Sequence, residues 1–175
     1  MRAGNAVVFA LVSILLGLAL PNSALAQIVA LGASNTQGKG VSSSEAWPAV
    51  LESMLQARGR NVHVTNAGIS GDTTGGELAR LDSSVPEGTT IVILNFGGND
   101  FRRGLRGNGP IVSPEERRAN MARILGELHR RHIRTVAADG IINSARAAGM
   151  VQSDGIHLTA EGHRWVANHL IGMVR

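Results

Sequence analysis

Three residues in the sequence are of the types that together make an activated serine. Ser34 lies in the segment Gly-Ala-Ser-Asn-Thr, and the segment Asp-Gly-Ile-His places Asp154 three residues before His157. A serine hydroxyl is a poor nucleophile unless a general base takes its proton, and histidine titrates near neutral pH. A carboxylate beside the imidazole fixes its tautomer and stabilises the imidazolium. The pattern predicts acyl transfer through an acyl-enzyme on Ser34.

Acyl transfer also requires hydrogen-bond donors for the negatively charged oxygen of the tetrahedral intermediate. The candidates are the backbone N–H groups of Ser34 and Gly71 and the side-chain amide of Asn99, in the segments NAGISGDTT and GGND. Asp72 and Asp100 directly follow two of these donors, and we expect them to brace the turns rather than to take part in the chemistry.

Each of these residues has a simpler role when it is taken alone. Ser34 could cap a helix, Asp154 could form a turn, and His157 could be a polar residue at a helix entry. Gly71 could permit a positive φ angle, and Asn99 could cap a turn. The five occur together in a fitting order, and that combination favours a serine hydrolase.

The segment GASNTQGKG also resembles a phosphate-binding loop, but its spacing is wrong. Such a loop has four residues between its first glycine and the Gly-Lys pair, followed by Ser or Thr. Here five residues separate Gly32 from Gly38, and Gly40 follows Lys39. We therefore reject nucleotide binding.

The remaining histidines do not have the spacing of a metal site, and the chain has no cysteine. We expect no metal and no cofactor. His163 is the competing general base, but it lacks an aspartate three residues ahead and falls within the predicted last helix. We therefore expect His163 on the surface. The other histidines are His63, His129, His132 and His169.

Four apolar runs have the pattern of strands, and helical patterns lie between them. This alternation predicts a parallel sheet covered by helices on both faces. Ligands in such sheets bind beyond the carboxyl ends of the strands, where three of the motif segments fall, and the fourth precedes a last helix expected from about Thr159. The predicted strands are residues 27–32, 61–66, 90–96 and 134–138.

Two capping boxes mark predicted helix starts: Ser42-x-x-Glu45, and Ser113-x-x-Glu116 with Pro114 at the first helical position. Apolar residues at helical spacing predict two buried stripes. Their members are Trp47, Leu51, Met54 and Leu55 in the first helix, and Met121, Ile124, Leu125 and Leu128 in the second.

Residues 1–26 have the pattern of a secretory signal peptide. Arg2 precedes an apolar run that ends in Ala-Leu-Ala. The run is shorter than the ~20 residues that span a bilayer, so we expect cleavage before Gln27 rather than a membrane anchor. The protein is then periplasmic or secreted, with one hydrolase domain over residues 27–175 and no integral membrane segment.

The basic charge does not indicate a nucleic-acid partner. The formal net charge is +4, but the arginines after Ser113 are interleaved with glutamates, and aromatic residues make up 3% of the chain. A nucleic-acid surface needs clustered basic charge, whereas this arrangement is typical of a solvated helix face. We expect no nucleic-acid partner.

The four motif segments resemble the blocks of the SGNH hydrolases, also called the GDSL esterase/lipase family, over about residues 28–174. Within that family the chain most resembles the bacterial thioesterase/lysophospholipase/arylesterase branch, and the segment NAGISGDTTGGELARL is very similar to the family's second block. The resemblance implies a three-layer α/β/α, flavodoxin-like sandwich with a short parallel sheet of four to five strands. The residues that it implies are Ser34, Asp154 and His157 for the triad, and Ser34, Gly71 and Asn99 for the oxyanion hole.

The chain departs from that family in two places. The family has an aspartate before the nucleophile, where this chain has Ala33, so the support of the nucleophile turn must differ. Only 15 residues (139–153) separate the fourth predicted strand from Asp154. They have the pattern of one short helix, which leaves a fifth strand open and little wall for a long acyl chain.

The predicted function is an exported serine esterase that acts on acyl esters of lipids, glycans or small molecules, with a preference for short acyl groups. Two alternatives remain open. One is a lysophospholipase or thioesterase acting on longer acyl chains. The other is a non-catalytic binding module on the same fold, for which Ala33 would be a mark of decay.

Overall fold

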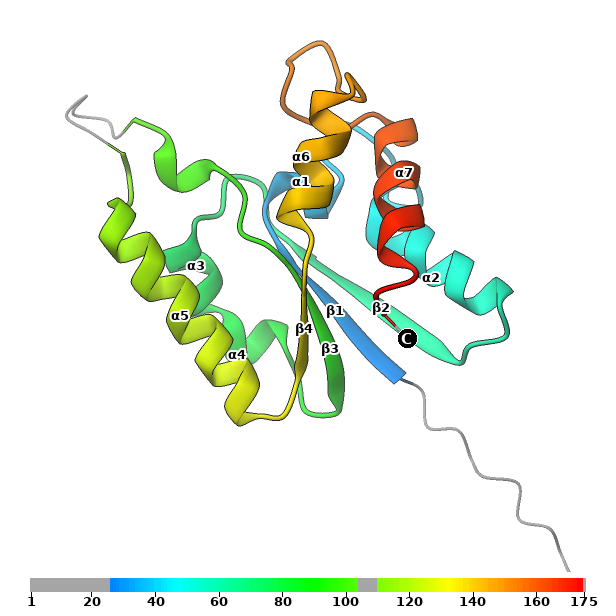
Figure 1. The fold of residues 1–175 in the computed structure, drawn as a ribbon, viewed down its shortest axis with the longest axis horizontal. Coiled ribbons are helices and arrows are strands. Elements are labelled where there is room, and N and C mark those ends of the chain that lie inside the picture. The colour runs from blue at the N-terminus through cyan, green and yellow to red at the C-terminus, as the bar shows by residue number, and fades with distance from the viewer. Residues whose placement is uncertain (1–25, 104–109, 175) are drawn as a thin grey trace, which may run out of the picture.

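Four parallel strands form one sheet in the computed structural model, which describes residues 26–103 and 110–174. The strands are β1 (Ala26–Gly32), β2 (Val62–Gly68), β3 (Thr89–Asn95) and β4 (Arg134–Ala137). Their order across the sheet is β2-β1-β3-β4, which is the flavodoxin-like order without its last strand (Figure 1). All four predicted strands are confirmed, with ends within two residues of the expected positions.

Helices connect these strands and cover the sheet. They are α1 (Ser34–Gln37), α2 (Trp47–Ala57), α3 (Thr74–Ala79), α4 (Leu81–Ser84), the 3₁₀ helix η1 (Asn99–Phe101), α5 (Pro114–Arg130), α6 (Asp139–Ala147) and α7 (Ala160–Leu170).

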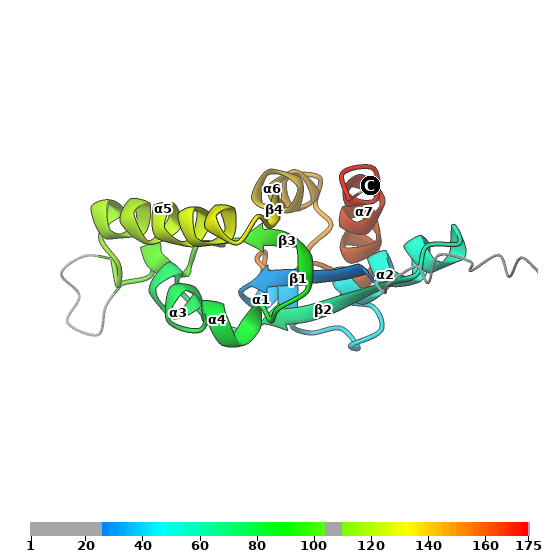
Figure 2. The ribbon, with the colours of Figure 1, turned by 90° about the horizontal axis from the view of Figure 1, so that it is seen from below.

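Successive residues of the central strands supply two separate cores. In β1, Ile28 and Ala30 belong to the core under α2, α6 and α7, whereas Val29 and Leu31 belong to the core under α4 and α5. Successive side chains of a strand point to opposite faces, so a strand that is apolar throughout binds helices on both sides. Figure 2 shows α3, α4 and α5 on one side of the sheet and α2 and α7 on the other. The predicted three-layer α/β/α architecture is confirmed.

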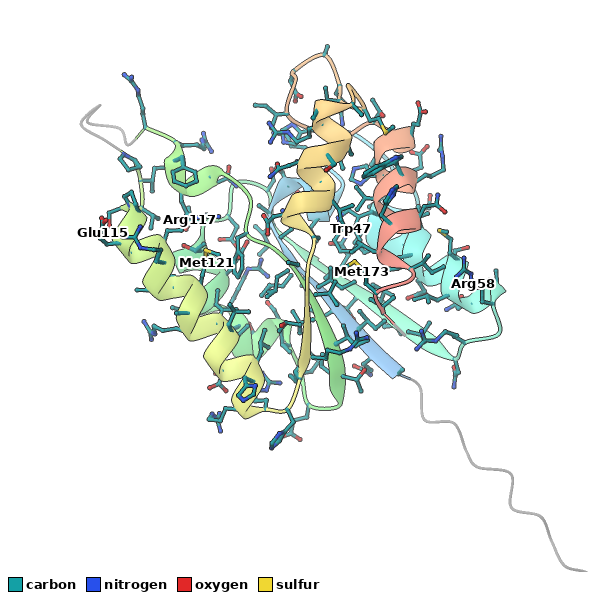
Figure 3. All side chains as sticks on the ribbon, viewed as in Figure 1. Trp47, Arg58, Glu115, Arg117, Met121 and Met173 are labelled. Atoms are coloured by element: carbon teal, nitrogen blue, oxygen red, sulfur yellow. The ribbon has the colours of Figure 1, made fainter. Side chains whose placement is uncertain are left out.

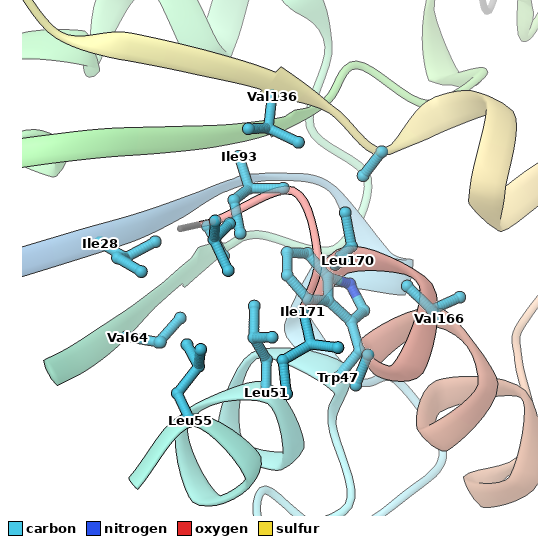
Figure 4. Packing of buried hydrophobic residues seen from close by; sticks show 14 of the residues in the cluster. Ile28, Trp47, Leu51, Leu55, Val64, Ile93, Val136, Val166, Leu170 and Ile171 are labelled. Carbon is cyan, nitrogen blue, oxygen red and sulfur yellow. The ribbon is translucent and has the colours of Figure 1, made fainter. Parts of the chain in front are cut away.

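The larger core confirms the first predicted stripe. Figure 4 shows Trp47, Leu51 and Leu55 of α2 packed with Val166 of α7 against the sheet. All four are buried, and Met54 lies half-buried at the margin of the same cluster.

The second stripe is narrower than predicted. Ile124 and Leu128 are fully buried and Met121 packs against them, but Leu125 is 40% exposed. Ile124 and Leu128 are one helical turn apart and share a face, whereas Leu125 is rotated by about 100° from Ile124. The prediction that Leu125 faces the core is wrong.

Of the predicted helix starts, those of α5 and α7 are confirmed, whereas the start predicted at Ser42 is not. Ser113 accepts a hydrogen bond from the Glu116 N–H and Thr159 accepts one from the Gly162 N–H, so α5 and α7 begin as predicted. Ser42 and Glu45 also contact each other, but in a turn before α2. Proline is tolerated in the first turn of a helix and not inside it. Pro48 therefore sets the start of α2 near Trp47.

The connection after β4 forms α6, as its pattern predicts. Val151 and Leu158 then make one antiparallel bridge before α7, and no fifth strand occurs among the described residues. β4 is therefore an edge of the sheet.

His163 is buried rather than exposed. Its Nδ1 accepts a hydrogen bond from the backbone N–H of Trp47 at 3.2 Å, and the side chain is fully buried. Burial lowers its pKa to about 4, against the raising effect of Glu45. His163 lies on the same helix face as the buried Val166 and Leu170, which follow it by three and seven positions. This spacing indicates burial, and the prediction of a surface position did not take it into account.

The predicted leader at residues 1–26 lies outside the described residues except for Ala26, which begins β1 and donates its N–H to the Asn61 carbonyl. No helix in the described ranges has the length and apolar character needed to cross a membrane.

Candidate active site

A cleft of about 790 Å³ opens beyond the carboxyl ends of the strands. These strand ends lie at the upper side of the sheet in Figure 1. The cleft lies where the connections of β1 and β3 leave in opposite directions, which is the usual ligand position in open parallel sheets. Ser34, Gly71, Asn99 and His157 all line this cleft. Asp154 is not on the cleft wall and contacts the far side of His157.

The turn from β1 into α1 places Ser34 at the first position of that helix. The Ser34 carbonyl accepts hydrogen bonds from Gly38 and Lys39, which close the turn. Gly32 is required before it, because a Cβ there would lie 2.4 Å from Thr36 Oγ1 and 2.7 Å from the Asn95 carbonyl oxygen. The close approach of the backbone at Gly32 to the end of β3 therefore fixes the position of Ser34 at the cleft.

Asp154 and His157 form a local pair. Asp154 Oδ2 lies 2.5 Å from His157 Nδ1, while Oδ1 accepts the backbone N–H groups of Ile156 at 2.9 Å and His157 at 3.0 Å. The hydrogen bond from the His157 ring, followed by those from the two N–H groups, holds the pKa of Asp154 well below its usual range. An ionised carboxylate at Nδ1 keeps the proton on that nitrogen and leaves Nε2 as an acceptor.

Two side chains that the sequence analysis did not select attach this pair to the nucleophile turn. Asn35 donates from Nδ2 to the Ile156 carbonyl at 3.3 Å and accepts the Leu158 N–H at 3.0 Å. Gln152 donates to the carbonyl oxygens of Lys39 and Leu158, both at 2.8 Å. The signal for Asn35 was its position directly after Ser34, whereas no motif marks Gln152.

The oxyanion candidates Gly71 and Asn99 lie in two turns that contact each other. Gly71 has φ of +85°, a left-handed conformation that L side chains rarely adopt. Asn99 donates from Nδ2 to the Asp72 carbonyl at 2.8 Å, which leaves its second amide hydrogen for another acceptor. In the described part of the chain, no protein acceptor is recorded for the N–H of Ser34 or of Gly71.

Asp72 and Asp100 brace this region as predicted. Asp72 accepts from Arg80 Nε at 2.7 Å, and Asp100 accepts the Thr74 N–H at 3.0 Å and pairs with Arg117. These charge-assisted hydrogen bonds stabilise the turns after β2 and β3, which lie outside the regular hydrogen bonding of the sheet.

Among the described residues, no hydrogen bond joins Ser34 to His157. Catalytic hydrogen bonds are often long without substrate and shorten when it binds. Ser34, Gly71, Asn99 and His157 line one cleft. Residues of these types in one cleft can activate a serine hydroxyl and bind an oxyanion. No group of three or more His, Cys, Asp or Glu side chains within residues 26–103 and 110–174 is placed to hold a metal ion.

Polar side chains predominate on the remaining cleft wall. Lys39, Arg102 and Arg146 stand on it, and α6 supplies Ile142 and Asn143. The expectation that residues 139–153 contribute little wall is therefore wrong, because α6 begins directly at the carboxyl end of β4. Figure 3 shows two further lining residues, Arg117 and Met121, directed from α5 toward the cleft while Glu115 points outward. The remaining apolar lining residues are Ala33, Phe101 and Ile156.

Glu77 of α3 is a buried carboxyl group close to these bracing residues. It is fully buried, and neither carboxylate oxygen has a hydrogen-bond partner within residues 26–103 and 110–174. Burial, reinforced by the negative charge of Asp72 and opposed by Arg80, raises the pKa of Glu77 to about 8. Ionisation of Glu77 therefore opposes folding.

Replacing Glu77 with glutamine is expected to make stability less sensitive to pH. The folded-state pKa is about 8 and the unfolded value is 4.5, so the wild type loses roughly 1.4 kcal/mol of stability per pH unit between these values. Glutamine keeps the shape without ionising, so its Tm should rise relative to wild type as pH increases from 5 to 9. Thermal unfolding measures this, with the exposed Glu161→Gln as the control. A Tm difference that is the same at every pH would contradict the assignment.

Both the sequence and the fold are similar to those of known proteins. The profile of the GDSL-like lipase/acylhydrolase family matches residues 30–148, a region that includes Ser34, Gly71 and Asn99 and ends before Asp154. The chain is 40% identical over 93 residues to esterase TesA of Pseudomonas aeruginosa, covering 52% of this chain and 45% of that protein. It is 38% identical over 96 residues to an arylesterase of Vibrio mimicus, covering 54% and 46%. The matches thus span a little under half the length of these relatives.

A solved structure extends the similarity to the whole domain. The crystal structure of AlinE4, described as an SGNH-hydrolase family esterase, aligns with a TM-score of 0.58 and 29% identity. The alignment covers 86% of this chain and 95% of that one.

Proposed function

Because the chain belongs to the GDSL-like lipase/acylhydrolase family, we propose that it is a serine esterase that hydrolyses acyl esters through an acyl-enzyme on Ser34. The observation that carries the proposal is the Asp154–His157 pair, whose imidazole opens into the same cleft as Ser34, Gly71 and Asn99.

In the proposed reaction, Nε2 of His157 takes the proton of Ser34 Oγ as the oxygen attacks the ester carbonyl carbon. The developing oxyanion accepts hydrogen bonds from the N–H groups of Ser34 and Gly71 and from Asn99 Nδ2. Collapse of the tetrahedral intermediate expels the alcohol, which takes its proton from the imidazolium. Water, activated by His157, then releases the acid and restores Ser34. Asp154 stays ionised throughout, as its low pKa requires.

The proposed substrates are ester-linked acyl groups on lipids, glycans or small molecules, with short acyl groups preferred. Each buried methylene contributes about 0.8 kcal/mol only if apolar wall covers it. The cleft has few apolar side chains, and Lys39, Arg102 and Arg146 stand among them. One alternative is a lysophospholipase or thioesterase activity on longer acyl chains. The other is a non-catalytic binding module on the same fold.

Export is also part of the proposal. The Ala-Leu-Ala ending of residues 1–26 supports cleavage before Gln27 and a periplasmic or secreted protein. The intact mass of the exported protein measures the cleavage position.

A series of p-nitrophenyl esters from two to twelve carbons tests the function and separates its alternatives. We expect kcat/KM to peak at or below four carbons, because charged side chains interrupt the apolar wall of the cleft and leave longer chains little further burial. The Ser34→Ala variant supplies the background rate. A profile that still rises at eight to twelve carbons would favour the long-chain alternative, and absence of turnover above background on every ester would favour the non-catalytic module.

A further inference from the structure

Asp139 begins α6 directly after β4, and its carboxylate faces the turn that follows β3. Oδ1 accepts hydrogen bonds from Asn95 Nδ2 at 3.0 Å and from the Gly97 N–H at 3.0 Å, and Oδ2 accepts the Phe96 N–H at 3.3 Å. Asp139 also lines the cleft. The Asp139 carboxylate thus accepts three hydrogen bonds from the end of β3 and the turn that follows it.

The conformation of this turn sets the position of Asn99. Gly97 has φ of +60° and is followed by Gly98, so the backbone between β3 and η1 has little conformational restraint of its own. Asn99 is the first residue of η1, and its Nδ2 is fixed from the other side by the Asp72 carbonyl. Asp139 fixes the backbone that leads into Asn99, while Asp72 fixes the amide.

The residue before the nucleophile gives this turn no polar support. Ala33 is buried, and its Cβ lies 3.6 Å from the position that a Cβ on Gly97 would occupy. A carboxylate at position 33, which the family pattern carries, would stand against the same turn. In this chain the carboxylate comes instead from the opposite side, on α6.

The same contact also reaches the nucleophile helix. Asn95 donates to Asp139 from Nδ2 and accepts a hydrogen bond from Thr36 Oγ1 at 3.3 Å on Oδ1. Thr36 is fully buried and lies two residues after Ser34. Asp139, Asn95 and Thr36 therefore connect the oxyanion turn to the helix that carries Ser34.

We propose that Asp139 is a positioning residue that acts through Asn99: it holds the turn after β3 so that the Asn99 amide meets the oxyanion in the transition state. The proposal rests on the proposed esterase function. Because Asp139 contacts the turn that leads to the oxyanion donor and acts on the transition state through that donor, its loss should lower kcat and leave KM nearly unchanged.

A double-mutant cycle between Asp139→Asn and Asn99→Ala tests this role. Asparagine keeps one acceptor oxygen but turns an NH₂ group toward the remaining N–H donors. We expect Asp139→Asn to lower kcat about 10- to 100-fold with KM within about threefold, since small displacements of a catalytic group have effects of this size. In the Asn99→Ala background the same change should lower kcat less than about threefold. The matched control is Asp82→Asn, whose side chain is 93% exposed.

Circular dichroism and thermal unfolding confirm that each variant folds. If the asparagine variant does not fold, Asp139→Glu takes its place in the cycle, because it keeps the charge and moves the oxygens by one carbon. The proposal is overturned if kcat stays within twofold of wild type, if the loss appears in KM, or if the two losses multiply independently. Turnover by the wild type is measured first, so a failure of the esterase function itself is recognised separately.

Discussion

Replacing either Ser34 or His157 with alanine is expected to lower kcat by on the order of 10⁶-fold, because nucleophile and base act as a unit. The residual rate comes from the oxyanion donors and from substrate binding. Hydrolysis of a short p-nitrophenyl ester measures the loss. A labelled fluorophosphonate gives a second measurement, since wild type should take up the label at Ser34 and both variants should not.

Two other histidines serve as comparisons. His129→Ala changes an exposed residue on α5 and should leave kcat unchanged. His163→Ala removes a fully buried side chain that accepts the Trp47 N–H, so it should lower Tm while kcat per folded molecule stays within a few-fold of wild type. If folded His163→Ala protein lost as much activity as His157→Ala, the assignment of His157 as the base would be wrong.

The Asp154→Asn variant is expected to lower kcat by roughly 10⁴-fold. Asparagine Oδ1 can still accept the N–H groups of Ile156 and His157, so the loop should keep its shape. Its NH₂ group would then face His157 Nδ1 and donate to it, which places the ring proton on Nε2. A protonated Nε2 cannot accept the proton of Ser34.

Kinetics on the same ester measure this loss, and the Tm of the variant reports whether the loop is intact. The carboxylate is 44% exposed, so its substitution should disturb the core little. Activity within tenfold of wild type, in a variant with unchanged Tm, would show that the carboxylate does not set the tautomer.

The sheet and the location of the site could be predicted from the sequence because both depend on local patterns. The four central residues of strand β3, Ile91 to Leu94, are apolar and buried on both faces, which requires a sheet covered on both sides. The carboxyl ends of β1, β2 and β3 are each followed by a motif segment, so their approach at one edge follows from parallel topology alone.

What the sequence analysis missed depends on contacts between distant segments. Asn35 and Asp139 were not selected because their partners lie 121 and 44 positions away. His163 was predicted to lie on the surface because it falls within the last helix and has no aspartate three residues ahead. Only the packing of α7 on α2 shows that it accepts the Trp47 N–H. In each case a tertiary partner decides the role of a polar side chain, and no local pattern encodes that partner.

The distance along the chain between Asn35 and its partners has a consequence for biosynthesis. Ser34, Gly71 and Asn99 all leave the ribosome before Asp154 and His157, and the bonds from Asn35 to Ile156 and Leu158 span 121 and 123 positions. Contacts of such long range form late in folding, because their loop-closure entropy is large. A nascent chain that has emerged only as far as α6 therefore contains Ser34 and the proposed oxyanion donors but lacks the proposed base. Hydrolytic activity would begin only when the α7 segment has emerged and docked, so incomplete chains would remain harmless to esters in the compartment where they are made.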